Sequence, residues 1–491
     1  MLKGKIVSLA LTKLSVMSII QSLFYGFLFF LLPCGVFAQI YTADLQRFID
    51  YPAGKIAITD VLLFDGTGAA PQPHQTILLE NGQITAVGAT GQVAAPADAT
   101  VINGTGKTVI PGLVMLHEHL YYTIPIDNFF NVAEMPGSFP RLYLAAGVTT
   151  SRTGGSVEPQ TDLALRRLIG EGKMLGPDMD VTAPYIERPG FDIPAINIVH
   201  NTAEAAREAA FWADKGFTSF KMYMHATRND LRVVVREAHH RGFKVTGHLC
   251  VLTYREAADL GIDDLEHGFM ASSDFDETKQ TDSFDYPKAH LALQQLPVNS
   301  PKMQALIAYL VSKKVAVTST LPVFEPMTGR ELIQGGGEDA VEPKVLERVK
   351  KRWEAAQGKD TAATALFAKE QAWEKQFYDA GGLLVAGTDP TGAGRTIAGY
   401  SNYREIELLV EGGFTVAQAI RICTLNGAIY LGRDQLIGTV SPGKHADLVL
   451  IDGDLGADVR NIRKTAVVFK GGVGFDSPKI FATVKQQVGI N

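Results

Sequence analysis

Residues 217–248 read FTSFKMYMHATRNDLRVVVREAHHRGFKVTGH, and this stretch decides the fold. Its two ends, 217–223 and 243–248, are short runs rich in apolar and β-branched residues, as strands buried on both faces are. Between them, 230–241 has the pattern of a helix. A strand, a helix and a second strand in succession predict two parallel strands joined by the helix.

The same alternation repeats through the middle of the chain, with another helical pattern at 202–215. Eight such units predict an α/β protein, a (β/α)₈ TIM barrel whose chemistry lies at the carboxyl ends of its strands. A charged, helix-prone stretch at about 325–380 is longer than a usual barrel loop and predicts a helical insertion, either a lid or a decoration of the rim. The eight expected strands are 109–116, 147–152, 179–184, 217–223, 243–248, 263–267, 315–321 and 382–388.

Strand patterns also flank this region on both sides. Asn81-Gly82 between two apolar runs is a strong hairpin signal, and strand patterns return only at 446–451 and 466–469. The simplest arrangement is a small domain built from both chain ends, with the barrel inserted between them. The expected domains are a composite β-sandwich at 39–110 and 433–485 and a TIM barrel at 111–432.

The first 38 residues differ from the rest of the chain. A positive start with Lys3 and Lys5 precedes an apolar run at 14–32, and Val36-Phe37-Ala38 offers small residues where a signal peptidase reads. We therefore expect a signal peptide at 1–38, export to the periplasm or the medium, and no stable membrane association after cleavage. The alternative is an uncleaved anchor, because a run of roughly 19 apolar residues could just span a bilayer.

The overall composition narrows the class of partner. The 491 residues carry a formal net charge of −6, which provides no basic surface for nucleic acid. We expect a small-molecule or dipeptide substrate, and the sequence leaves a homo-oligomer open. Cys250 and Cys423 alone would remain in the mature chain, and two cysteines do not make a disulfide framework.

The candidate chemistry begins at His117-Glu118-His119, which ends the first expected strand. Residues i and i+2 of a strand point to the same side, so both imidazoles can reach one metal ion, and imidazole is a good ligand for zinc. Other polar residues end later strands, where the rim of a barrel would collect them. The six candidate ligands are His117, His119, Lys221, His248, His267 and Asp389.

With these residues the chain resembles the amidohydrolase superfamily, and most of all its branch of imidazolonepropionase-like and Xaa-Pro dipeptidase-like proteins. The likeness runs from about Ile56 to Gly472. One departure is Arg152-Thr153 in the second strand, where many relatives carry Arg followed by Asp. The stretches that carry the resemblance are 111–119, 147–150, 266–268, 386–389 and 437–448.

The resemblance implies two divalent metal ions, with zinc as the expected metal. It implies that His117, His119 and Asp389 hold the first ion and that His248 and His267 hold the second. Between the ions it implies a hydroxide and Lys221 carboxylated by carbon dioxide. Physical chemistry agrees, because desolvation and two nearby dications favour the neutral amine that can add carbon dioxide.

The expected activity is hydrolysis of an amide-like carbon–nitrogen bond of a small molecule by the metal-bridged hydroxide. Asp389 would act as general base and then as general acid. Tyr223 and His225 share the strand parity of Lys221 and are further catalytic candidates, and Tyr185 is a candidate for substrate contact.

Three other functions remain open at this point. One is an exported Xaa-Pro-type dipeptidase or carboxypeptidase, which Arg188 or Arg395 would support by pairing with a substrate carboxylate. The others are a lactonase, because a two-metal hydroxide can also attack esters, and a non-catalytic binding protein on the same fold. Intact metal ligands argue against the binding protein.

Overall fold

The computed structural model describes residues 40–126, 129–190, 193–330, 335–356 and 361–490, all of which belong to one structural unit. The predicted signal peptide at 1–38 lies outside these described residues. Within the described ranges, none of the helices combines the length and the apolar character that crossing a membrane requires.

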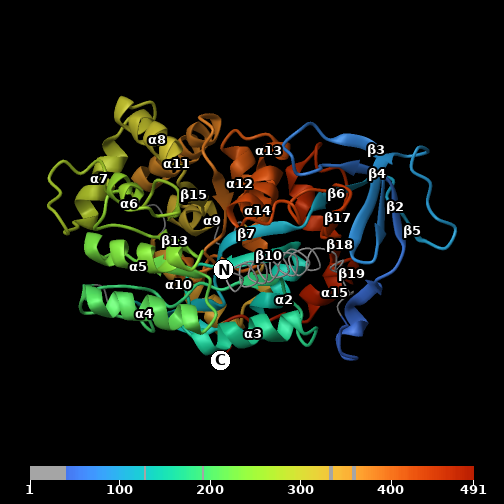
Figure 1. The fold of residues 1–491 in the computed structure, drawn as a ribbon, viewed down its shortest axis with the longest axis horizontal. Coiled ribbons are helices and arrows are strands. Elements are labelled where there is room, and N and C mark those ends of the chain that lie inside the picture. Colours follow the sequence, from blue (N-terminus) through green and yellow to red (C-terminus); the bar gives the residue numbers. More distant parts are fainter. Residues whose placement is uncertain (1–39, 127–128, 191–192, 331–334, 357–360, 491) are drawn as a thin grey trace, which may run out of the picture. The chain divides into compact units, whose positions relative to one another are not determined.

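Eight short parallel strands form the centre of the α/β region (Figure 1). They belong to two sheets, one in the order β7-β10-β11 and one running from β12 to β16. Each strand overlaps one of the eight stretches predicted from sequence. The strands are β7 (Leu113–Glu118), β10 (Val148–Thr153), β11 (Asp178–Asp180), β12 (Ser219–Met222), β13 (Lys244–Gly247), β14 (Asp264–Glu266), β15 (Ala316–Ser319) and β16 (Leu384–Ala386).

Individual hydrogen bonds connect the two sheets. A parallel bridge pairs Thr182 with Ser219 and links the chain after β11 to β12. On the other side, the N–H groups of Thr388 and Asp389 donate to the His117 carbonyl at 3.1 and 3.0 Å, so the end of β16 meets β7. The strands therefore follow one another in space in sequence order. The α/β class is confirmed. Among the described residues, β16 and β7 are not paired as strands of one sheet, so the described strands do not form a closed barrel.

Helices between the strands cover this centre, and α5 (Arg228–His240) shows why they form where they do. Its start is a capping box, in which Thr227 and Asp230 satisfy each other's backbone N–H groups. Leu231, Val234 and Val235 form its buried face. Gly242 follows with a φ of +75°, a left-handed conformation that glycine adopts without strain and that ends the helix.

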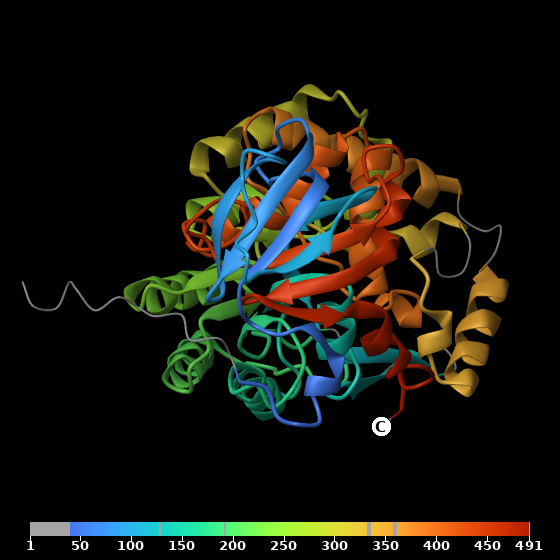
Figure 2. The same ribbon diagram turned by 90° about the vertical axis from the view of Figure 1, so that its right-hand side faces the viewer.

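A separate sheet of nine strands combines both ends of the chain (Figure 2). Its centre is an antiparallel pair, in which Leu448 of β17 faces Pro111 of β6. The predicted hairpin is present, and Asn81 and Gly82 both have positive φ, as a two-residue turn requires. The strands, in spatial order, are β1 (Ile49–Tyr51), β19 (Val473–Asp476), β18 (Thr465–Lys470), β17 (Leu448–Asp452), β6 (Lys107–Pro111), β2 (Ile56–Leu63), β3 (Gln72–Glu80) and β4 (Gln83–Ala89), with β5 (Thr100–Asn103) beside β2.

The prediction of a single first strand at 109–116 is wrong. The chain leaves the nine-stranded sheet at Pro111 and enters the parallel strands at Leu113. Gly112 makes this transition, and a Cβ there would clash with the side chain of Thr149. A continuous apolar run therefore covers two strands of different sheets, and hydrophobicity alone does not reveal the break.

Two long helices of different roles lie in the described part of the segment between β15 and β16. The second, α11 (Thr361–Asp379), buries Trp373 and Phe377 and packs against the barrel strands and helices like any other element of the core. The first, α10 (Pro343–Ala356), packs against β8 (Tyr121–Ile126). Within this segment, α10 and the chain around it are an addition to the alternating pattern.

Candidate metal centre and active site

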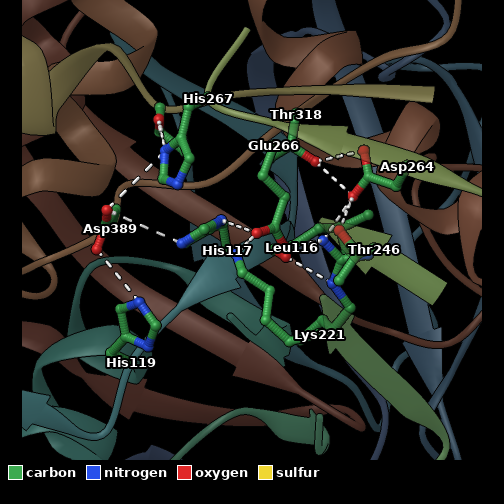
Figure 3. A network of polar contacts seen from close by, with 12 residues as sticks. Leu116, His117, His119, Lys221, Thr246, Asp264, Glu266, His267, Thr318 and Asp389 are labelled. Atoms are coloured by element: carbon green, nitrogen blue, oxygen red, sulfur yellow. Dashed lines mark hydrogen bonds and ion pairs between the residues drawn. The ribbon is translucent and has the colours of Figure 1, made fainter. Parts of the chain in front are cut away.

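The six predicted ligands come together at the carboxyl ends of the strands, and all of them except His248 are labelled in Figure 3. The ring of His267 lies between two others, with centroids 4.6 Å from His117 and 4.5 Å from His248. His119 lies 5.2 Å from His117 by the same measure, and its Nε2 is 3.2 Å from Asp389 Oδ1. The other Asp389 oxygen is 3.9 Å from both His117 Nε2 and His267 Nδ1.

Unusual backbone geometry aims two of these side chains. His267 and Asp389 follow β14 and β16 with φ of +70° and +45°, a left-handed conformation that is uncommon for residues other than glycine. Such a conformation costs on the order of 1–3 kcal/mol, and it persists where the surrounding structure imposes it, often at functional sites. The hydroxyl of Thr320 lies 2.9 Å from His267 Nδ1 and orients the ring.

Burial keeps the imidazoles of His117, His248 and His267 neutral. It lowers the pKa of His248 to about 3 and those of His117 and His267 well below the usual value, with smaller contributions from neighbouring positive groups such as Lys221. Burial acts in the opposite direction on Asp389, but a hydrogen bond from His119 and its positive field overcome it and hold the Asp389 pKa below its usual range. Neutral imidazole and ionised carboxylate are the forms that bind metal ions.

The donor set fits a divalent cation. Single ligand atoms of His117, His267 and Asp389 all lie within 4.8 Å of one another. Nδ1 of His117 and Nδ1 of His119 are buried and have no hydrogen-bond partner among the described residues. Clustered imidazole nitrogens with a carboxylate oxygen are the ligands that zinc and similar ions take.

Lys221 has a partner that the sequence analysis did not identify. Its Nζ forms an ion pair with Glu266 Oε2, and the same oxygen lies 3.4 Å from His117 Nδ1. Burial lowers the Lys221 pKa well below its ordinary value. Glu266 stands in the quoted Glu266-His267-Gly268 motif, so the signal was present, but its side chain was not assigned a place.

Buried charges of alternating sign continue from Lys221 and Glu266 to Arg152 and Asp264. Figure 3 labels Lys221, Glu266 and Asp264. Arg152 Nη2 lies 3.3 Å from Glu266 Oε1 and 2.7 Å from Asp264 Oδ2. Asp264 also accepts hydrogen bonds from the hydroxyls of Thr246 and Thr318. Arg152, which matches the relatives, is thus part of this buried network, and the departure from them lies at Thr153. The neighbouring Thr153 instead accepts a backbone hydrogen bond from Thr182.

A cavity of about 90 Å³ opens onto the ligands. Tyr121 and Tyr185 share a hydrogen bond of 2.7 Å between their hydroxyls, and Tyr223 packs edge-on against Tyr185 at 5.0 Å. Tyr223 thus lies in the site, as predicted. The lining residues are His117, His119, Tyr121, Thr123, Phe130, Val132, Val157, Tyr185, Ile193, Pro194, Ile196, Lys221, Tyr223, His267, Asp389 and Thr391.

The covering wall of this cavity comes from β9 (Phe129–Glu134) and from residues 193–196. None of the described residues of the 325–380 segment lines it. The α10 part of that segment instead supports the hairpin of β8 and β9, where Arg352 donates to the Phe129 carbonyl at 2.8 Å. The wall next to the ligands is therefore the β8–β9 hairpin, which the sequence analysis did not single out.

Three other candidates lie outside the cavity lining. The prediction that Arg188 is available for a substrate carboxylate is wrong, because its Nε and Nη2 bind both carboxylate oxygens of buried Asp230 at 2.9 and 2.8 Å. His225 Nδ1 lies 3.3 Å from Glu187. Arg395 is half-buried, and burial lowers its pKa to about 10.

Comparisons with known proteins agree with this geometry. Residues 333–474 match the model of the amidohydrolase family. No curated protein matches the chain in sequence. Among solved structures, the chain is similar to a candidate prolidase from Bifidobacterium longum, with 23% identity and a TM-score of 0.61 over 88% of this chain and 99% of that one.

Two other solved structures share the fold. A Xaa-Pro dipeptidase with bound methionine in its active site is 18% identical, with a TM-score of 0.63 over 86% of this chain and 100% of the other. The ochratoxinase of A. niger is 17% identical, with a TM-score of 0.62 over 89% and 98%.

The family match confirms the resemblance to the amidohydrolase superfamily that the motifs predicted. The class of protein is therefore a hydrolase acting on carbon–nitrogen bonds.

Proposed function

We propose that this protein is a binuclear metal-dependent amidohydrolase that cleaves an amide-like carbon–nitrogen bond of a small molecule or dipeptide. The scaffold would be a (β/α)₈ barrel, as the strand order supports. One observation carries the proposal, namely the convergence of four imidazoles, Asp389 and Lys221 on one buried site at the strand ends.

The residues assigned to each metal follow from their positions. His117, His119 and Asp389 would hold one ion, and His248 and His267 the other. Lys221 would bridge them once carboxylated, which requires it to leave its ion pair with Glu266. When bound, the ions supply a hydroxide near neutral pH and polarise the substrate carbonyl.

Asp389 is the proposed proton-transfer group. Its carboxylate lies within 4 Å of three imidazoles and lines the cavity, so it can both bind and face a substrate. Its lowered pKa keeps it ionised and able to accept a proton from the attacking water. It would then pass that proton to the departing nitrogen.

The tyrosines would position the substrate. Tyr223 lies beside His248, with ring centroids 5.1 Å apart, and Tyr121 lies 4.5 Å from His119. Burial raises the pKa of both phenols well above 10, so they stay protonated and can donate hydrogen bonds to a developing oxyanion. The catalytic role assigned to His225 has less support, because His225 lies against Glu187 and is not among the residues that line the cavity.

The test is a substrate screen combined with metal analysis. The protein loaded with zinc should contain close to two ions per chain and hydrolyse one or more members of a panel of N-acyl amino acids, Xaa-Pro dipeptides and cyclic amides. A chelator should abolish the activity, and zinc should restore it. A metal content well under one per chain, with no turnover of any panel member, would instead favour a binding protein.

Export is proposed on the amino-terminal sequence alone. Cleavage after Ala38 would leave Gln39 as the first residue of the mature chain. Mass spectrometry of the protein recovered from its native compartment tests this directly. An intact first segment in the membrane fraction would support the anchor instead.

A further inference from the structure

A second and larger cavity adjoins the metal centre. It has a volume of about 700 Å³, and Val132 and Val157 line both it and the smaller cavity. Ala195 lines the larger cavity, while its neighbours Pro194 and Ile196 line the smaller one. The two cavities are therefore adjacent, with Val132 and Val157 between them.

The charged groups of this second cavity are all acidic. Among the residues that line it, only Glu134 and Glu158 carry charge. Glu158 directly precedes α3 (Pro159–Gly170), and Asp162 lies one turn into that helix with an exposure of 2%. Within the described part of the chain, none of these three carboxylates forms an ion pair with a lysine, arginine or histidine.

Three carboxyl oxygens of Glu134 and Asp162 also lack hydrogen-bond partners among the described residues. Both oxygens of Glu134 and Oδ1 of Asp162 are shielded from solvent and have no hydrogen-bond partner among the described residues. A buried acceptor left without a partner costs on the order of 1–3 kcal/mol, and more when charged. An unsatisfied pair of this kind is explained if a donor from a ligand completes it.

The pKa values of Glu134 and Asp162 also indicate that a positive charge is missing beside these carboxyl groups. Burial, together with the negative fields of Asp162 and Glu158, raises the pKa of Glu134 to about 9. Burial likewise raises the pKa of Asp162 to about 7. A neighbouring cation would lower both values, and the described side chains do not provide one.

We propose that the second cavity binds a cationic group of the substrate, a primary ammonium or a guanidinium, while the amide bond is cleaved at the metal centre. Glu134 is the principal partner, with Glu158 and Asp162 supplying the surrounding negative charge. The preferred substrates would be amides or dipeptides with a basic side chain. This inference rests on the proposed amidohydrolase function and narrows its substrate class.

Matched substrates test the inference. N-acetyl-lysine and N-acetyl-norleucine, and the proline dipeptides of lysine and norleucine, differ mainly in the terminal ammonium. With the zinc-loaded protein, kcat/KM for the basic member should exceed that of the neutral member by about tenfold or more. The ratio should fall towards one in Glu134→Gln. Glu347→Gln, at an exposed glutamate of α10, is the control and should leave the ratio unchanged.

Calorimetry separates this inference from the proposed function. Lysine and norleucine, as product-like probes, are titrated into the zinc-loaded protein whether or not a substrate is turned over. Tighter binding of lysine, weakened in Glu134→Gln and by added salt, supports the cationic subsite even if the amidohydrolase screen fails. Equal binding of the two probes, or a preference that survives both Glu134→Gln and Glu158→Gln in folded protein, overturns it. In that case Glu134 and Asp162 are simply protonated structural groups.

Discussion

Lys221 and Glu266 form an ion pair among the central parallel strands, and both side chains are almost completely buried. Glu266 also lies against His117 and Arg152, so it links the metal centre to the charged network beneath it. Removing one member of a buried pair leaves the other charge without compensation, which costs far more than an exposed pair is worth. The proposed metal centre therefore depends on a carboxylate that is not itself a ligand.

Glu266→Ala should destabilise the protein strongly. We expect a loss of about 3–5 kcal/mol in the free energy of unfolding, because Lys221 and Arg152 would lose a buried counter-charge. Urea denaturation of the metal-free protein measures it. The control is Glu347→Ala, which removes an exposed pair with Lys351 and should cost under about 1 kcal/mol. Equal losses in the two variants would show that the buried pair does not stabilise the fold.

Asp389→Asn should remove turnover and preserve the fold. The amide keeps the shape of the side chain but cannot accept the proton, so kcat should fall by about 10²–10⁴-fold. Circular dichroism and metal content should be measured on the same sample, because a lost metal would mimic a lost base. Activity near the wild-type level in metal-replete Asp389→Asn protein contradicts the assigned role.

Metal removal should lower thermal stability. The ligands join strands that are distant in sequence, so ions that bind only the folded state stabilise it, by about 2.7 kcal/mol at a free concentration near 100 times Kd. We expect a higher Tm on adding zinc and a lower one with a chelator, and the response should be weaker in His267→Ala. His239→Ala is the control, because His239 is partly exposed and paired with Asp263 on the outer surface. A zinc response that His267→Ala leaves intact would place the ion elsewhere.

Stability should fall as the pH rises from about 4.5 to about 8, in part because of Glu370. Burial raises the pKa of this carboxyl to about 8, whereas the unfolded value is near 4.5. The folded state therefore holds a proton that the unfolded state has released, so the contribution is complete below about pH 4.5 and is lost as the pH rises through 8. The slope is at most about 1.4 kcal/mol per pH unit for one proton.

Glu370→Gln should flatten this dependence. The amide oxygen can still accept the 2.7 Å hydrogen bond that the Phe269 N–H donates to the native carboxyl. The variant should match the wild type near pH 5 and exceed its stability near pH 9, as measured by urea denaturation at the two values. Parallel stability profiles for the two proteins would rule out Glu370 as a source of the pH dependence.

Much of the fold was readable from local patterns. The alternation of strand and helix places all eight central strands, and Asn81-Gly82 places a hairpin, because backbone preferences act over a few residues. The first strand was misplaced because Pro111-Gly112 lies within one apolar run while the chain passes from one sheet to another. Hydrophobicity reports that a segment is buried, but it does not report against which neighbour.

The identities and strand-end positions of His117, His119, Lys221, His248, His267 and Asp389 were determined by the sequence itself, since parallel strands bring their carboxyl ends to one side. Only the tertiary structure decided which charges meet there. It pairs Lys221 with Glu266, commits Arg188 to Asp230, and leaves Glu134 and Asp162 without a cation among the described residues. Such pairings depend on distances of a few ångströms between residues far apart in the chain, and no local preference encodes them.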